Sequence, residues 1–462
     1  MNRTLALDHL ERAITLDPSH LKARLALAEL YSEEKNAKKA IKLLEEGIGK
    51  DFDSPLVRTA LAKLLISEGK NDRAMEHLEV AAEGDLDDPE SRFQIAQLLS
   101  NQGKSKRAAD QLTKVIELDP LNGEAHYLLA LLLNHPDDFD RAKLLLEIAI
   151  DLMPRDERPF FQLAELLFRG EQTDHEGNLY RESASEEAEK LYEKVLKLSP
   201  RHGPANLKLG TILEESGDVA SAKRLYELAT GEKSSAGTAH LRLAKLAEAQ
   251  ADLDATLDFL DQAIKSKESK AVAYWRRAEI LWDREQIKLV EEDLKKSLET
   301  FEKDEREYRN ASSLSSDNSD FAQARRELDK ADEARKCMAP VLLLSAKIKL
   351  LQKQSDLALE LLEKAISLSP NFAEARHELA KLLDANGRVE EAASQYEATV
   401  QADWCFPEAH FKLGQMAGKG GNLEKAEMHF RIVLDLEENH GEAKAALQKV
   451  ERKLRSSSKK HK

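Results

Sequence analysis

The chain has 462 residues and a formal net charge of −15 at pH 7. This charge disfavours a general binder of nucleic acid or of an anionic membrane, because both need a net basic surface. Charged residues make up 34% of the chain and aromatic residues only 5%, as expected where polar helix faces surround a thin apolar core.

The first 20 residues have the pattern of a single amphipathic helix. Ala6, Leu10 and Ala13 share one helix face, and Pro18 ends the segment. We expect a half-repeat here, consisting of a second helix only, at a start that is truncated or that docks on a partner or a second copy. Charged residues interrupt the apolar stripe, which excludes a signal-peptide core. No apolar run in the chain is long enough to predict membrane insertion.

A repeat then runs through the chain and is clearest between Pro89 and Pro120, where apolar stripes mark two helices separated by Gly103. Such a hairpin has too little core to be stable alone, so it must stack on similar neighbours. Steps of 34 residues, with one jump of 46, connect small or β-branched residues: Ala6, Ala40, Ala74, Ala108, Ala142, Ala188, Ala222, Thr256, Val290, Ala324, Ala358, Ala392 and Ala426. Four residues beyond each stands a large apolar side chain: Leu10, Leu44, Leu78, Leu112, Leu146, Tyr192, Tyr226, Leu260, Leu294, Leu328, Leu362, Tyr396 and Phe430.

This period and residue pattern resemble the tetratricopeptide repeat (TPR) family over nearly the whole chain. The resemblance implies an all-α fold, a right-handed α-solenoid (superhelix) of stacked TPR helix-turn-helix units. It also implies that the first helices of the repeats line a concave groove. The fold follows from this resemblance, but the partner does not.

The predicted N-terminal TPR array covers residues 21–304. The 46-residue jump inserts residues 169–183, a polar segment with two glycines and no helical stripe. We expect a protruding loop there, and a tolerated surface insertion is the interpretation we favour over a functional one.

Residues 305–338 keep the position in the repeat but lose its pattern. Ala311 and Ser312 stand where a first helix should carry an apolar residue and a small one. The serine-rich run from Ser312 to Ser319 favours turns and caps over helix interiors. We therefore predict a degenerate repeat and a hinge, whose serines are candidates for phosphorylation.

The C-terminal TPR array is predicted at residues 339–440. A capping helix should follow at 441–455, because its apolar residues lie on one side and its charged residues elsewhere. Residues 456–462 form a short basic tail, for which terminal disorder is the simplest expectation.

The sequence shows no catalytic constellation, cofactor motif or metal site. A glycine-lysine-serine sequence at Gly103 resembles the end of a phosphate-binding loop, but Leu98 stands where that motif needs another glycine. The 13 histidines form no metal-binding spacing. His126, His240 and His410 share one position of the repeat, which indicates scaffold residues. We expect a chain that is not an enzyme and needs no cofactor.

The two cysteines point to a reducing compartment. Cys337 and Cys405 are 68 residues apart, which is two whole repeats. Stacked helices lie about 8–10 Å apart, so the two sulfurs should be beyond disulfide reach. We expect a cytoplasmic protein, with the nucleus as the alternative.

Two runs of residues fall on positions that the resemblance places in the groove: Phe93, Tyr127 and Phe161 on one position, and Lys208, Arg242 and Arg276 on the adjacent one, with Lys245 and Trp275 nearby. They predict an apolar shelf next to a basic ladder that accepts acidic groups of a peptide. The alternative is that the aromatic residues pack between helices and the cations pair with acidic neighbours such as Glu215, Glu248 and Asp283.

The function that these observations favour is a non-catalytic scaffold that holds peptide segments or partner subunits of a multi-subunit complex in its groove. A second hypothesis is the substrate-recruiting TPR region of a larger enzyme or assembly whose catalytic part is not in this chain. A third, RNA binding through the basic ladder, is disfavoured by the net charge.

Overall fold

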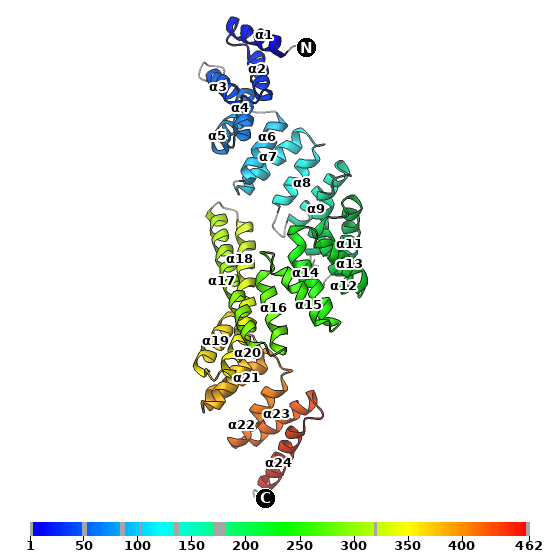
Figure 1. The fold of residues 1–462 in the computed structure, drawn as a ribbon, viewed down its shortest axis with the longest axis vertical. Coiled ribbons are helices and arrows are strands. Elements are labelled where there is room, and N and C mark those ends of the chain that lie inside the picture. The colour runs from blue at the N-terminus through cyan, green and yellow to red at the C-terminus, as the bar shows by residue number, and fades with distance from the viewer. Residues whose placement is uncertain are drawn as a thin grey trace. The chain divides into compact units, whose positions relative to one another are not determined.

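The computed structural model describes residues 3–48, 53–83, 88–101, 103–133, 138–169, 181–317 and 321–458. Within these ranges the chain forms 24 α-helices and no β-strand (Figure 1). The all-α prediction is confirmed. Among the described helices, none is long and apolar enough to cross a bilayer.

The first compact unit comprises Met1–Asp218 together with Ser312–Arg325. Helices of about one repeat half each make up its first part: α1 (Arg3–Leu16), α2 (Leu21–Glu33), α3 (Ala37–Ile48), α4 (Pro55–Ser67), α5 (Asn71–Glu83), α6 (Pro89–Asn101), α7 (Ser105–Leu118), α8 (Gly123–Leu132), α9 (Phe139–Leu152), α10 (Glu157–Arg169), α11 (Arg181–Leu198) and α12 (Gly203–Glu215).

The second compact unit comprises Val219–Ala311 and Arg326–Lys462. It contains the remaining helices, apart from the adjoining ends of α17 and α18: α13 (Val219–Ala229), α14 (Lys233–Ala249), α15 (Leu253–Ala263), α16 (Lys270–Asp283), α17 (Ile287–Asp317), α18 (Phe321–Leu351), α19 (Ser355–Leu368), α20 (Ala373–Ala385), α21 (Val389–Ala402), α22 (Pro407–Lys419), α23 (Leu423–Leu436) and α24 (Gly441–Ser458).

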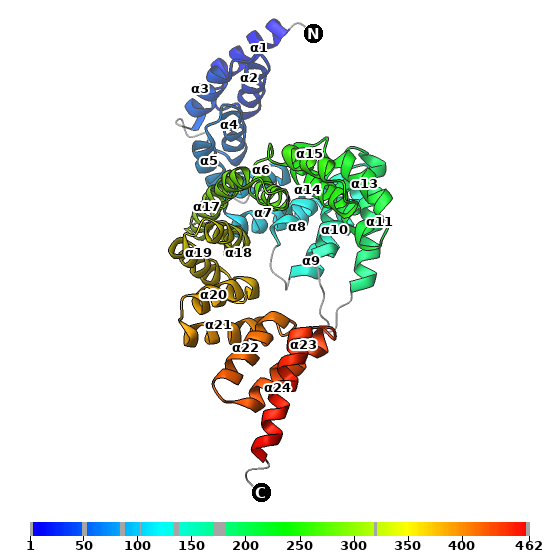
Figure 2. The same ribbon diagram turned by 60° about the horizontal axis from the view of Figure 1, so that its bottom comes forward.

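Within each compact unit, helices pack on their neighbours in the sequence. In the described residues most contacts join successive helices, and second-neighbour contacts include those of α2 with α4, of α17 with α19 and of α22 with α24. Figure 2 shows the same succession of paired helices from a second direction. Contacts restricted to neighbours define a solenoid, so the predicted stacking of helical hairpins is confirmed.

The stripe of small residues is the core of this stacking. Twelve of its thirteen members are buried, and only Ala6, in the first helix, is half-buried. The large apolar residue four positions later is buried in most repeats as well. The exceptions are Leu10, which is half-buried, and Leu328 on α18, which is 37% exposed.

Nine of the turns inside hairpins contain a residue with positive φ in the part of the chain that the structure describes. Five of these are glycines with φ between 72° and 92°: Gly69, Gly103, Gly217, Gly387 and Gly421. Other repeats have a larger residue at the same position with φ between 57° and 61°: Lys35, Ala251, Glu285 and Lys353. Only glycine adopts this backbone conformation without strain. Gly103 therefore marks a turn between paired helices, as the sequence predicted.

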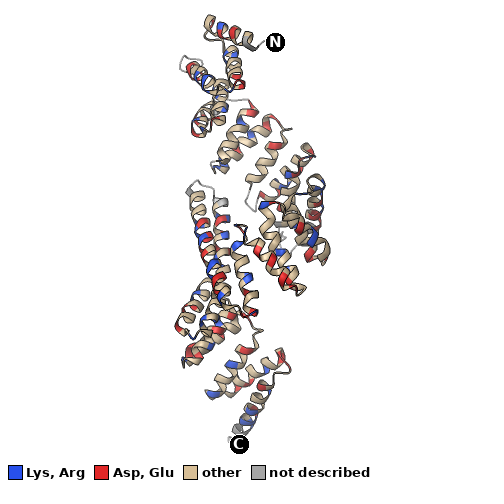
Figure 3. Ribbon diagram, viewed as in Figure 1, with Lys and Arg blue, Asp and Glu red and all other residues tan. Residues whose placement is uncertain are grey.

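Helices α17 and α18 depart from the regular pattern. Each has 31 residues and spans two repeat halves with no turn between them (Figure 1). The structure differs from the prediction at the serine-rich run, because α17 continues through Ser312 to Asp317. Ser319 lies outside the described residues, and the hinge remains a prediction. Along both helices, basic and acidic residues are interspersed (Figure 3).

Two other predicted segments lie wholly or partly outside the description. Of the insertion at 169–183, the structure describes only the ends, where α10 stops at Arg169 and α11 starts at Arg181. The tail beyond Ser458 is also outside it. Helix α24 occupies the residues predicted to form a capping helix, and its Val450 packs with Ala426 and Phe430.

Candidate functional site

A cavity of about 370 Å³ in the second compact unit lies among α14, α15 and α16. Arg242 and Lys245 line it from α14, and Trp275 and Arg276 line it from α16. Leu260 of α15 contributes to its apolar part. The structure therefore brings four of the eight predicted groove residues to one place.

The repeat explains why these four residues converge. Arg242 and Arg276 are 34 residues apart, so they occupy the same position on two successive first helices. Lys245 lies three residues after Arg242 on α14, which puts both side chains on one helix face. Trp275 precedes Arg276 on α16 and brings an aromatic ring beside the cations.

Arg276 is held by two carboxylates. Its Nη2 donates to Glu248 Oε2 at 2.8 Å and its Nη1 donates to Glu279 Oε2 at 2.7 Å. Its guanidinium also lies 5.9 Å from the centre of the Trp275 ring. Burial raises the pKa of Glu279, although Arg276 opposes the shift. Pairing with Glu248 was the alternative that the sequence left open for this cation.

Trp275 contributes a hydrogen-bond donor that is not satisfied. The residue packs against the apolar cluster of α16, α17 and α18, and its Nε1 atom is buried. No hydrogen-bond partner for this N–H exists among the described residues. Tryptophan, arginine and lysine side chains donate hydrogen bonds and accept none. Most polar side chains that line the cavity are thus donors, which favours a ligand that supplies acceptors.

The other four predicted residues lie in the first compact unit. Phe93 on α6 is half-buried. Tyr127 on α8 is buried, with the Arg158 guanidinium 5.1 Å from its ring centre, and burial raises its pKa. Phe161 on α10 packs its ring 4.7 Å from His202.

Lys208 on α12 already contacts two groups of α10. Its Nζ is 3.6 Å from Glu165 Oε1 and 5.1 Å from the centre of the Phe168 ring. These four residues do not line the cavity of the second compact unit, and the described contacts do not gather them into one site. Their role in a groove remains a prediction.

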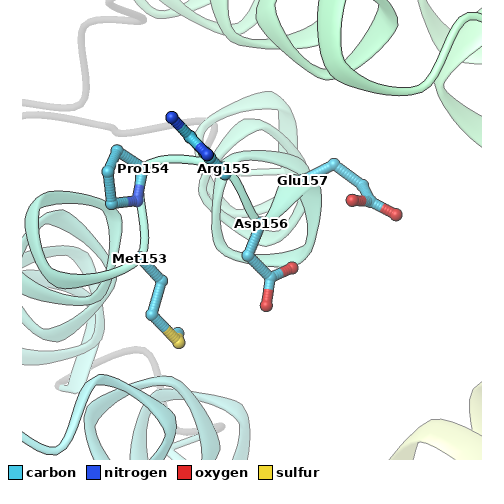
Figure 4. A pocket seen from close by; sticks show the side chains of 5 residues that line it. All are labelled: Met153, Pro154, Arg155, Asp156 and Glu157. Atoms are coloured by element: carbon cyan, nitrogen blue, oxygen red, sulfur yellow. The ribbon is translucent and has the colours of Figure 1, made fainter.

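A second hollow, of about 520 Å³, lies at the turn between α9 and α10 (Figure 4). Five consecutive residues from Met153 to Glu157 line it, and Figure 4 shows their side chains pointing in different directions. Arg158 binds the Asp156 carboxylate at 2.6 Å and, with that bond, holds the pKa of this group below its usual range. A hollow formed by one turn, whose acid is already paired, offers no converging set of ligand groups.

The position shared by His126 and His410 has a structural role that the sequence did not reveal. A side chain there hydrogen-bonds the carbonyl six residues earlier, in the turn between repeats. The described residues show this hydrogen bond, called the turn lock below, between Arg24 and Pro18 (3.0 Å), His126 and Pro120 (3.1 Å), Asn206 and Pro200 (3.2 Å), Arg376 and Pro370 (2.7 Å), and His410 and Trp404 (3.1 Å). A hydrogen-bonding residue six positions after Pro18, Pro120, Pro200 and Pro370 is the sequence signal that could have found it.

The described residues contain no group of three or more His, Cys, Asp or Glu side chains that could hold a metal ion. Cys337 is half-buried and Cys405 is exposed, and both are free thiols. Burial raises the pKa of Cys337, so its thiol stays protonated and weakly nucleophilic.

Two family models, both described as tetratricopeptide repeat, match most of the chain. One matches residues 3–64, 65–132 and 349–403, and the other matches 178–237, 207–272 and 377–443. A comparison with curated proteins finds no match.

Several solved structures are similar to this chain at low sequence identity. The C-terminal part of a TPR repeat-containing protein from Cytophaga hutchinsonii is 16% identical, with a TM-score of 0.42, over 54% of this chain and 97% of that one. The APC/C hetero-tetramer Cut9–Hcn1 is 13% identical, with a TM-score of 0.41, over 97% and 93% of the two chains. Yeast Tom70 is 17% identical, with a TM-score of 0.35, over 87% and 96%. These scores are too low to carry an inference about function.

Proposed function

Because the chain belongs to the tetratricopeptide repeat family, whose repeats generally mediate protein interactions, we propose that it is a non-catalytic scaffold within a multi-subunit complex. It holds a segment of a partner protein in the cavity among α14, α15 and α16. The observation that carries this proposal is the convergence of three cations and Trp275, whose indole N–H is unsatisfied, on one cavity with an apolar wall.

The chemistry of the cavity favours an acidic segment. Arg242, Lys245 and Arg276 line it together with a single carboxylate, that of Glu248. A ligand carboxylate can accept charge-assisted hydrogen bonds from these cations, while a neighbouring apolar side chain packs against Leu260 and Trp275. The ligand must compete with Glu248 and Glu279 for Arg276. Glu279, whose pKa burial raises, takes up a proton most readily when a further negative charge arrives.

The same cavity fits the second hypothesis, a recruiting region of a larger enzyme or assembly. The two hypotheses differ in what the chain is attached to and agree on what the cavity binds. RNA binding makes a different prediction: its affinity would fall steeply with salt as counterions are released from many phosphates. Binding of one carboxylate would fall only mildly with salt.

Selection from a bead-bound library of seven-residue peptides tests the proposal with the full chain. We expect enrichment of Asp or Glu next to an apolar residue. The double variant Arg242→Glu/Lys245→Glu should lower the affinity for a selected peptide at least about tenfold, because charge reversal replaces attraction with repulsion.

The matched control is Lys288→Glu/Lys295→Glu, which changes the net charge equally at two exposed positions of α17. This control should leave the affinity unchanged. Selection without acidic enrichment, or an equal loss of affinity in both double variants, would contradict the proposal.

A further inference from the structure

A second cavity, of about 480 Å³, lies among α20, α21 and α22 in the same compact unit. Its lining residues stand four repeats, or 136 positions, after lining residues of the first cavity. The corresponding pairs include Lys245 and Lys381, Glu248 and Asp384, Leu260 and Tyr396, Trp275 and Phe411, and Arg276 and Lys412. The repeat has therefore built one kind of cavity twice.

The two cavities share an aromatic wall and an ion pair. In the second cavity Lys412 lies 3.9 Å from Asp384, as Arg276 lies 2.8 Å from Glu248 in the first. Phe411 precedes Lys412 as Trp275 precedes Arg276. The equivalence thus extends from positions in the repeat to the contacts that the side chains make.

Their charges differ. Lys381 and Lys412 are the cations that line the second cavity, and Asp384 and Glu408 are its carboxylates. Glu408 stands at the position that Val272 occupies in the first cavity. Lys381 is also bound by Glu378, with both carboxylate oxygens at 3.0 Å. The excess of positive charge that marks the first cavity is therefore missing from the lining of the second.

The second cavity instead contains two buried polar groups without partners. Tyr396 is fully buried and His377 is 8% exposed, and their ring centres are 5.6 Å apart. Neither the Tyr396 hydroxyl nor the His377 Nδ1 has a hydrogen-bond partner in the described part of the chain. Buried polar groups are normally hydrogen-bonded, so each exception needs an explanation.

Comparison with Tyr192 shows what the Tyr396 hydroxyl lacks. Tyr192 occupies the same position of the repeat, and its hydroxyl donates to Glu165 Oε1 at 2.7 Å. The position of Glu165 on the first helix is taken in the later repeat by Lys381. Lysine carries no acceptor, so the hydroxyl of Tyr396 lacks the partner that Glu165 gives to Tyr192.

We infer that the cavity among α20, α21 and α22 binds the carboxamide side chain of an asparagine or glutamine in a partner's peptide segment. The Tyr396 hydroxyl donates to the amide oxygen, and the amide nitrogen donates to His377 Nδ1, with the His377 proton on Nε2. Phe411 packs against the aliphatic part of the side chain. A charged side chain of either sign would meet a like charge in the balanced lining and would lose its hydration.

This inference rests on the proposed function in one respect, that the ligand is a peptide segment, but it uses none of the residues of the first cavity. Selection from the same seven-residue library should therefore show a second enriched class, with Asn or Gln. The variant Tyr396→Phe should lower the affinity for a peptide of this class at least about tenfold and leave the acidic class unchanged.

Tyr192→Phe is the matched control, since it deletes a hydroxyl at the same position of another repeat. Tyr192→Phe should lower the melting temperature, because it breaks a bond to Glu165, and keep carboxamide selection. Tyr396→Phe should not lower the melting temperature, because its hydroxyl has no protein partner to lose. A lowered melting temperature with unchanged selection would make this hydroxyl structural and overturn the inference.

A pH profile tests the acceptor role of His377. Burial lowers the pKa of His377, and the charges that face it are Glu378 and Glu408, which raise the pKa, and Lys381 and Lys412, which lower it. Affinity for the carboxamide class should be constant near neutral pH and fall below the ordinary histidine range, when Nδ1 becomes a donor. An affinity that rises on acidification would overturn the assignment.

Three outcomes separate this inference from the proposed function. Loss of acidic selection alone in Arg242→Glu/Lys245→Glu supports two independent sites. Acidic selection with no carboxamide class overturns only the inference. Absence of any enriched class overturns both.

Discussion

The turn between α19 and α20 and the middle of α17 occupy equivalent positions of the repeat but have different structures. Pro370 stands in that turn, between Leu368 at the end of α19 and Ala373 at the start of α20. Two repeats earlier the equivalent residue is Glu302, and it lies inside the 31-residue helix α17. The same difference recurs in α18, which also runs through a position where a turn is expected.

The two segments differ in two local features of the sequence. At the regular turn, the Pro370 carbonyl accepts from Arg376 Nε at 2.7 Å, and Arg376 Nη1 donates across to Gln395 Oε1 at 2.9 Å. In α17 the residue equivalent to Arg376 is Tyr308, and residues 302–307 are charged, mostly good helix formers. Helix α17 therefore has neither a proline nor a turn lock at these positions.

The comparison separates two functions within the repeat. The stripe of small residues sets the spacing, and it remains buried through the irregular region at Val290, Ala324 and Ala358. The break between repeats depends instead on a few residues around each turn. The stripe thus stays buried even where the turns between repeats are lost, although contacts such as Glu302 with Lys364 join residues on either side of the irregular repeat.

The largest effect should come from forcing a break into α17. Glu302→Pro removes a helical hydrogen bond and introduces a clash with the preceding turn, so we expect a loss of about 3 kcal/mol or more. Trp404→Pro is the matched change, since Trp404 occupies the turn position that is proline in several other repeats. It should cost less than about 1 kcal/mol.

Hydrogen exchange measured by mass spectrometry gives the loss of stability in each variant for the segment around the substituted residue. Glu302→Pro should increase exchange across the middle of α17, while Glu302→Ala, which deletes the same carboxylate, should not. Equal protection in the proline and alanine variants would show that α17 is not continuous there.

A smaller effect on stability should distinguish a turn lock made by a histidine pair from the one made by Arg376 and Gln395. His410 Nε2 donates to the Trp404 carbonyl, so its Nδ1 accepts from His429 Nδ1 at 3.0 Å, and the His410 ring must be neutral. Burial lowers the pKa of both histidines, that of His429 to about 4. Nearby Lys425 lowers the pKa of His429 further and Glu397 raises it.

The sign of the pH dependence follows from these lowered pKa values. Between the ordinary histidine pKa of about 6.5 and the folded value, the unfolded chain binds more protons, so stability is lost as pH falls. We expect α22 and α23 to lose about 2 kcal/mol between pH 7 and pH 5.

Hydrogen exchange of α22 and α23 at the two pH values, corrected for intrinsic rates, checks this loss. His429→Gln places at this position the residue that Gln395 provides to Arg376, and it should remove much of the acid sensitivity. An unchanged pH dependence in this variant would assign the titration to other groups.

Much of this architecture could be predicted from the sequence because it depends on spacing. The buried stripe from Ala40 to Ala426 and the turn at Gly103 follow from the period alone. Four of the cavity residues, among them Trp275 and Arg276, could be chosen because equivalent positions of successive first helices face the same side.

The rest depends on contacts that spacing does not specify. The serines from Ser312 onward suggested a break, yet the Ser312 hydroxyl bonds the Ala324 carbonyl at 2.8 Å while its backbone stays helical. Tertiary context overrode a weak local propensity. Phe411 and Lys412 occupy the same positions as Trp275 and Arg276, but the repeats between carry other residues and hide the equivalence.

The smallest effect should come from the turns inside the hairpins. Gly387 has a φ of +77°, and a Cβ added to it would meet no atom within 4 Å, so Gly387→Ala should cost only backbone strain, about 1 kcal/mol. Lys353 has a φ of +61° at the equivalent position and already bears that strain. Lys353→Gly should therefore raise the free energy of unfolding, but by somewhat less than Gly387→Ala lowers it, since glycine adds entropy to the unfolded chain. Urea unfolding of the two variants measures both changes in the free energy of unfolding. A Gly387→Ala variant as stable as the parent would mean that these turns tolerate any residue, leaving the turns between repeats as the sites where sequence sets helix length.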